Sequence, residues 1–136
     1  MYIDQFPDMR IDNYLSVWVG HSTSEKALEK LLRTSYEVDI DGIAPWIEDA
    51  FEIVGYNEDF LDIAYSDSPL SPVELALRTS FGIQFQDLLY IDVKDVGLKD
   101  VNSLIVAGNL RYDGHIKFAK TNSTELTFVG SYQFKF

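Results

Sequence analysis

Apolar and other residues alternate between Tyr14 and Val19, which is the two-residue repeat of a β-strand. Leu15, Val17 and Val19 fall on one side of this segment. Trp18 adds a large apolar group to the other side. Because both sides carry apolar groups, the pattern predicts a strand that lies inside a sheet.

Three segments instead repeat their apolar residues every three or four positions, as amphipathic helices do. They begin at Ser22, Pro45 and Ser71, and we expect them to end near Thr34, Val54 and Gly82. The starts Ser22-Thr23-Ser24-Glu25 and Ser71-Pro72-Val73-Glu74 both have the spacing of a capping box. A proline suits the first turn of the second and third helices, and Gly55 is predicted to cap the second helix at its C-terminus.

The C-terminal half of the chain returns to β-rich runs, at Leu88–Val93, Leu104–Ala107 and Ile116–Ala119. In the last segment, every second residue is a large apolar residue or glycine, and this pattern predicts one long half-buried strand. These residues are Leu126, Phe128, Gly130, Tyr132, Phe134 and Phe136. We expect a β-bulge at Gly130. Asp113-Gly114 predicts a two-residue hairpin turn.

Together these elements predict an α+β fold, with a single antiparallel β-sheet and about three helices packed on one face. The chain has 136 residues, 46% of them hydrophobic, so it can bury a core of its own as one domain spanning residues 1–136. It has no repeat and no linker-like tract. It also has no cysteine, which excludes disulfides, thiolate metal ligands and a thiol nucleophile.

The net charge is −11, from 22 acidic and 11 basic residues. Such a charge disfavours direct binding to nucleic acid or to an anionic membrane. No apolar stretch is long enough for a signal peptide or a membrane-spanning helix, so we expect a cytoplasmic protein.

The negative charge is concentrated between Arg33 and Arg78, where eleven acidic residues occur without any lysine or arginine. Aromatic residues are interleaved with these acids, and tyrosine and tryptophan often anchor protein interfaces. This segment predicts a surface that binds a basic protein partner. Its candidate partner-binding residues are Asp39, Asp41, Trp46, Glu48, Asp49, Glu52, Tyr56, Glu58, Asp59, Asp62 and Tyr65.

Catalytic signatures are missing from the sequence. Neither His21 nor His115 is paired with a nucleophile, and no hydrolase, nucleotide-binding or zinc-protease motif occurs. Two acidic groups could supply oxygen ligands to Mg²⁺ or Ca²⁺, but neither has the alternation of a calcium-binding loop: Glu48, Asp49 and Glu52, and Glu58, Asp59 and Asp62. We therefore expect no cofactor, no specific metal and no enzymatic activity.

The segment Leu15-Ser16-Val17-Trp18-Val19-Gly20, with the helix start after it, resembles the opening of the immunity protein 22 family of bacterial polymorphic toxin systems. Ala44-Pro45-Trp46-Ile47-Glu48-Asp49-Ala50-Phe51 and Tyr56-Asn57-Glu58-Asp59-Phe60 are similar to later blocks of that family. The resemblance covers residues 14 to 61. His21 departs from the family's pattern, and residues 1–13 are interpreted as an N-terminal extension.

The resemblance implies a small cytoplasmic antidote that binds a cognate toxin domain and blocks it without catalysis. Many such toxins are nucleases with basic substrate-binding surfaces, which an acidic surface would match. Two alternatives stay open at this stage. One is an acidic regulatory or adaptor domain with no toxin partner, and the other is a Mg²⁺- or Ca²⁺-dependent enzyme.

Overall fold

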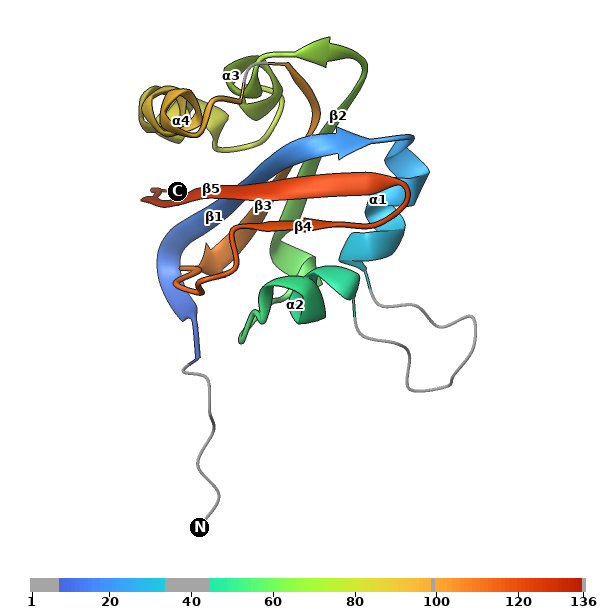
Figure 1. The fold of residues 1–136 in the computed structure, drawn as a ribbon. Coiled ribbons are helices and arrows are strands. Elements are labelled where there is room, and N and C mark those ends of the chain that lie inside the picture. Colours follow the sequence, from blue (N-terminus) through green and yellow to red (C-terminus); the bar gives the residue numbers. More distant parts are fainter. Residues whose placement is uncertain (1–7, 34–44, 99, 136) are drawn as a thin grey trace.

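The described part of the chain, residues 8–33, 45–98 and 100–135 of a computed structural model, contains one five-stranded antiparallel sheet (Figure 1). The strand order is β2-β3-β1-β5-β4, so the α+β class and the central place of the first strand are confirmed. The strands are β1 (Arg10–Ser22), β2 (Leu61–Leu70), β3 (Val101–Leu110), β4 (Phe118–Lys120) and β5 (Thr124–Gln133). The helices are α1 (Glu25–Leu32), α2 (Trp46–Phe51), the 3-10 helix η1 (Glu58–Phe60), α3 (Pro72–Ala76) and α4 (Gly82–Val96).

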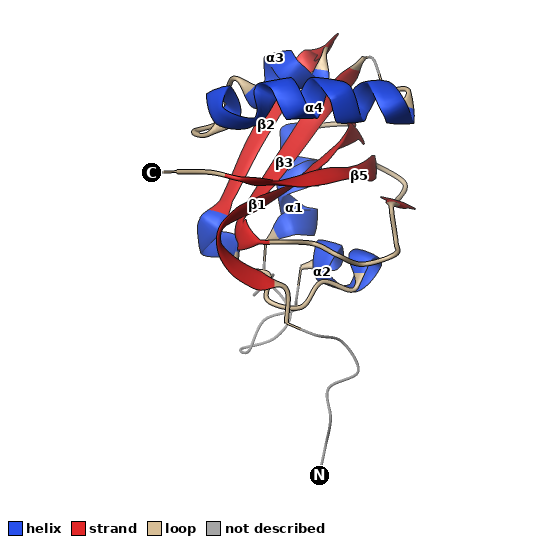
Figure 2. Cartoon of the chain, turned by 90° about the vertical axis from the view of Figure 1, so that its left-hand side faces the viewer, coloured by secondary structure: helices blue, strands red, loops and turns tan. Residues whose placement is uncertain are grey.

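Helices cover both faces of the sheet, so the expectation of helices on one face is wrong. The helices α3 and α4 lie on one face, and α1 and α2 lie on the other (Figures 1 and 2). The central strand supplies both cores, since Val17 packs beneath α4 whereas Trp18 packs against α1 and α2. Apolar groups on both sides of β1 therefore reflect two buried faces.

The bulge expected at Gly130 is confirmed, and it changes which face β5 presents. Val17 pairs with Gly130 whereas Trp18 pairs with Phe128, which leaves Val129 as an extra residue in β5. One extra residue shifts the alternation of side chains by one position. Even-numbered residues before the bulge therefore point to one face of the sheet, and even-numbered residues after it point to the other. Phe128 packs with α1 and α2, and Tyr132 packs with α4. The prediction of a single half-buried face is therefore wrong.

Helix starts follow local capping rules more closely than helix ends do. The capping box at Ser71 and Glu74 is confirmed. The first helix is capped by Ser24, whose hydroxyl accepts a hydrogen bond from the Ala27 amide, because the predicted cap, Ser22, still belongs to β1. The second helix ends at Phe51.

Left-handed backbone geometry explains the early end of α2. Glu52 has φ of 54° and forms the C-terminal cap, in place of the predicted Gly55. The backbone amide of Glu52 donates to carbonyl groups in the last turn of α2, which completes the end of the helix.

Three local predictions in the second half of the chain are also wrong. Gly82 begins α4 instead of ending a helix, and residues 88–93 are helical instead of forming a strand. Asp113-Gly114 forms no hairpin, because β3 pairs with β1 and β2 while β4 pairs with β5. Neither residue has the positive φ that the predicted turn requires. The edge strand β2 was not predicted.

Candidate partner-binding surface

Four predicted acidic residues lie together at the end of the molecule formed by α2 and η1, and we call them the acidic surface: Glu48, Asp49, Glu52 and Glu58. Asp49 and Glu52 are exposed, and Glu48 is half-buried. Burial raises the pKa of Glu48, and the nearby carboxylates of Asp49 and Glu58 raise it further. This end of the molecule therefore holds mutually repelling carboxylates.

Within the described ranges, the ion pairs join Arg10 to Asp8 and His21 to Glu125. None of them involves Glu48, Asp49 or Glu52. Within residues 8–33, 45–98 and 100–135, these three carboxylates therefore form no ion pair, and the nearby charge of Arg33 acts on the Tyr56 hydroxyl.

Two of the predicted partner-binding residues, Trp46 and Tyr56, are aromatic and make contacts inside the protein next to the acidic surface. Trp46 is half-buried, and its ring contacts Phe51 edge-on at 6.4 Å between centroids. The Tyr56 hydroxyl donates a hydrogen bond to the Leu32 carbonyl, at the end of α1. Burial and the carboxylate of Glu58 raise the pKa of Tyr56, which keeps this hydroxyl protonated as a donor. Tyr56 therefore ties the loop after α2 to α1.

Asp59 and Asp62 lie around the edge of the sheet from α2, where both line a cavity of about 360 Å³. Asp62 pairs with Val106, which belongs to the core under α3 and α4, so its side chain is on that face. Its carboxylate accepts a 2.9 Å hydrogen bond from the Ser80 amide. Apolar walls complete the cavity, among them the exposed ring of Phe60.

The remaining predicted residues are not brought to the acidic surface. Tyr65 lies farther along β2, where it lines another hollow with Ser24 and Arg78. Its carbonyl oxygen accepts a 3.3 Å hydrogen bond from the Arg78 guanidinium. Asp39 and Asp41 lie outside the described residues.

The two histidines lie apart from the acidic surface. His21 approaches Glu125 at 3.4 Å between Nδ1 and Oε1, and His115 is exposed on the connection between β3 and β4. In the described ranges, no three histidine or carboxylate side chains are grouped closely enough to hold a metal ion. No helix in these ranges combines the length and apolar character needed to cross a membrane.

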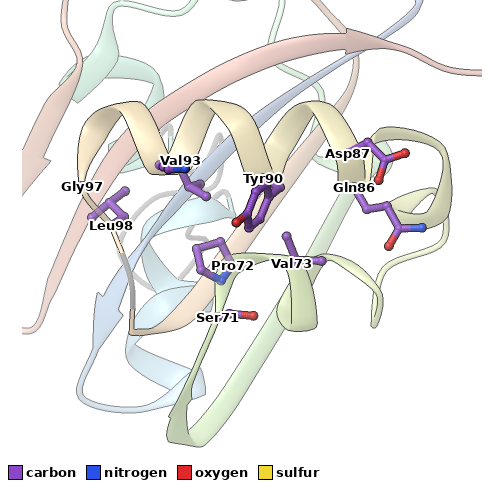
Figure 3. A pocket seen from close by; sticks show the side chains of 10 residues that line it. Ser71, Pro72, Val73, Gln86, Asp87, Tyr90, Val93, Gly97 and Leu98 are labelled. Atoms are coloured by element: carbon purple, nitrogen blue, oxygen red, sulfur yellow. The ribbon is translucent and has the colours of Figure 1, made fainter.

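A groove that was not predicted lies on the opposite face of the molecule, between α3 and α4 (Figure 3). Its volume is about 560 Å³, and its walls include Pro72, Val73 and Tyr90. Five of the nine large apolar side chains exposed in the described ranges lie on α4: Ile83, Leu88, Tyr90, Ile91 and Val96. The signal was present as the apolar run over residues 88–93, which the period-two interpretation assigned to a strand.

Comparison with known proteins gives one match. A family model described as Immunity protein 22 matches residues 15–135. No curated protein and no solved structure matches the chain. The family match confirms the resemblance observed over residues 14 to 61 and extends it through β5.

Proposed function

The chain belongs to the immunity protein 22 family, and from this premise we propose that it is an antidote that binds a cognate toxin domain and blocks it. The family match is the observation that carries this proposal, because it spans all the described helices and all of the sheet except the first five residues of β1. Inhibition requires only occupation of the toxin's working surface, so the antidote needs no catalytic group of its own. We place this encounter in the cytoplasm.

We further propose that the toxin is basic, as a nuclease is at its phosphate-binding cleft. Support comes from the acidic surface, where Glu48, Asp49 and Glu52 form no ion pair in the described ranges. Charge complementarity would accelerate association, which can rise by orders of magnitude through electrostatic steering. The antidote would then cover the cleft that otherwise holds nucleic acid.

We assign the contacts with the toxin to those predicted partner-binding residues that are exposed. Asp49, Glu52 and Asp59 would meet basic side chains of the toxin, and the exposed ring of Phe60 would add apolar contact beside them. The cavity that Asp59 and Asp62 line offers a place for one lysine or arginine side chain, because it combines carboxylates with apolar walls. Tyr56 is assigned a structural role, since its hydroxyl is already bonded to Leu32.

A calorimetric titration against the toxin domain encoded beside this gene tests the proposal. We expect nanomolar binding that weakens as salt is raised, because salt screens exposed charges. The absence of binding to a folded toxin domain would overturn the antidote assignment and favour an adaptor with another partner.

Charge reversal then tests the surface separately from the function. The triple variant Glu48→Lys, Asp49→Lys and Glu52→Lys should slow association at least tenfold. A matched control makes the same change in charge at exposed positions outside the acidic surface: Asp67→Lys, Asp95→Lys and Asp100→Lys. Equal slowing in both triples would show that only net charge matters. An unchanged association rate in the first triple would place the interface elsewhere.

A further inference from the structure

We propose that the outer side of α4 is a second interface, through which two copies of this chain associate about a twofold axis. The proposal is independent of toxin binding, because it concerns the face of the sheet opposite the acidic surface (Figure 1).

The first observation is that α4 is apolar on both of its sides. Phe85, Leu89 and Val93 are buried against the sheet. On the outer side, Ile83 is 77% exposed and Tyr90 is 58% exposed. Isolated exposed apolar residues need no explanation, but several on one helix beside a groove are typical of an interaction surface.

The second observation is that the charges on this surface complement themselves. Asp87 and Lys94 are both exposed, and both line the groove together with Tyr90. They are seven residues apart, which places them on the same side of a helix two turns from each other. When two copies of α4 pack antiparallel, the acid at one end of the stripe can therefore pair with the base at the other end of the second copy's stripe.

A twofold axis through the middle of this stripe brings opposite charges together at both of its ends. Midway between Asp87 and Lys94 lie Tyr90 and Ile91, so antiparallel packing on that centre places Asp87 of each copy opposite Lys94 of the other. Tyr90 of one copy then lies beside Tyr90 of the other, close to the axis.

The position of the acidic surface also leaves the outer side of α4 open to a second copy. Self-association of a chain with net charge −11 is opposed by repulsion if the acidic regions meet. The acidic surface lies beyond the other face of the sheet, so packing through α4 keeps the two acidic surfaces at opposite ends of the pair (Figure 1). Both would stay open to toxin.

We expect a weak dimer, because α4 has 15 residues and is therefore about 22 Å long, which is small for a protein interface. Sedimentation over a range of concentrations should show 15.5 kDa at micromolar protein and a shift toward twice that mass at higher concentration. A chain that stays monomeric up to millimolar concentration would overturn the proposal.

Charge exchange tests the pairing itself. Asp87→Lys and Lys94→Asp should each raise the dissociation constant of the dimer at least tenfold, because the twofold axis makes every change act on two pairs. The double variant with both changes should return it to within about threefold of the original value. Asp95→Lys is the matched control, because Asp95 is exposed on α4 but lies about 100° around the helix from Lys94. Failure of the double variant to recover would overturn the pairing.

A covalent test is available because the chain has no cysteine. Tyr90→Cys places a single thiol beside the axis, so mild oxidation should link two copies, whereas Asp95→Cys should link far less. If both thiols link equally, the contact is random collision and the proposal fails. If the chain is monomeric while Tyr90→Ala abolishes toxin binding, the surface belongs to the toxin interface instead, which also overturns a self-association role.

Discussion

The hydroxyl of Tyr132 donates a 2.6 Å hydrogen bond to the carboxylate of Asp92 and thereby joins β5 to α4. Tyr132 is buried, whereas Asp92 is half-buried on the helix. Burial and the adjacent carboxylate raise the pKa of Tyr132, so the phenol stays neutral and remains the donor. The bond fixes α4 over the part of β5 that follows the bulge.

Removing this donor should weaken the fold measurably. We expect Tyr132→Phe to lower the free energy of unfolding by about 1 kcal/mol, since Asp92 can still bond to water. Urea unfolding of Tyr132→Phe, Asp92→Ala and the double variant forms a double-mutant cycle. A coupling energy of at least about 0.5 kcal/mol is expected, and additive effects would mean that the bond contributes nothing.

Close packing of the two central strands requires glycine at position 20. A Cβ atom at Gly20 would lie 1.8 Å from the Glu125 carbonyl oxygen, which is a backbone atom and cannot rotate away. Gly20→Ala should therefore cost about 3 kcal/mol or more. Gly108→Ala is the control, because its Cβ would lie 3.2 Å from the Phe60 carbonyl oxygen. Thermal unfolding should separate the two variants, and equal midpoints would contradict this register of β1 and β5.

The two tryptophans should differ sharply in fluorescence. Trp18 is fully buried among Phe51, Tyr112 and Phe128, and its indole nitrogen has no hydrogen-bond partner in the described ranges. The variant Trp46→Phe leaves Trp18 as the single emitter, so its emission should be blue-shifted and resist quenching by acrylamide. Efficient quenching in the folded variant would show that this core admits solvent.

The acidic surface should make stability depend on pH in a defined direction. Burial, Asp49 and Glu58 raise the pKa of Glu48 above its ordinary value of 4.5, so the folded state holds this proton more tightly than the unfolded state does. The resulting penalty is absent below that ordinary value and grows as pH rises through the folded pKa.

The neutral variant Glu48→Gln should remove this penalty. We expect it to be more stable than the original chain by about 0.2–0.5 kcal/mol at pH 7, and by less at pH 4. Denaturation at both pH values measures the difference, with Asp67→Asn as an exposed control from outside the acidic surface. A stabilisation equal at both pH values would show that the charge of Glu48 is not the cause.

Local signals in the sequence predicted those elements that local chemistry determines. Ser71 and Glu74 form their capping box within four residues, and the bulge at Gly130 follows from a glycine inside a strand pattern. Residues 88–93 of α4 have the pattern of a strand, because the outer side of the helix is as apolar as its inner side, which hides the helical period. The strand β2 was missed because acidic and serine residues interrupt its apolar positions.

The candidate site was predictable in its composition but not in its arrangement. Eleven acids without a lysine or arginine are visible in the sequence, and the acids of α2 do lie together. The positions of Asp62 and Tyr65 depend on the path of β2 along the edge of the sheet. Side chains alternate along a strand, so Asp62 lies on one face and Tyr65 on the other. That path depends on pairing with β3, about forty residues later in the chain.

The sheet separates two cores that share no buried side chain, and this separation has a thermodynamic consequence. Ile47 belongs to α2 and Leu89 belongs to α4, and their side chains are buried on opposite faces of the sheet. Losses in unfolding free energy from truncating both should therefore add, because neither cavity touches the other. A substitution in the layer beneath the acidic surface thus leaves the packing beneath α4 unchanged, although both layers contribute to the same unfolding free energy.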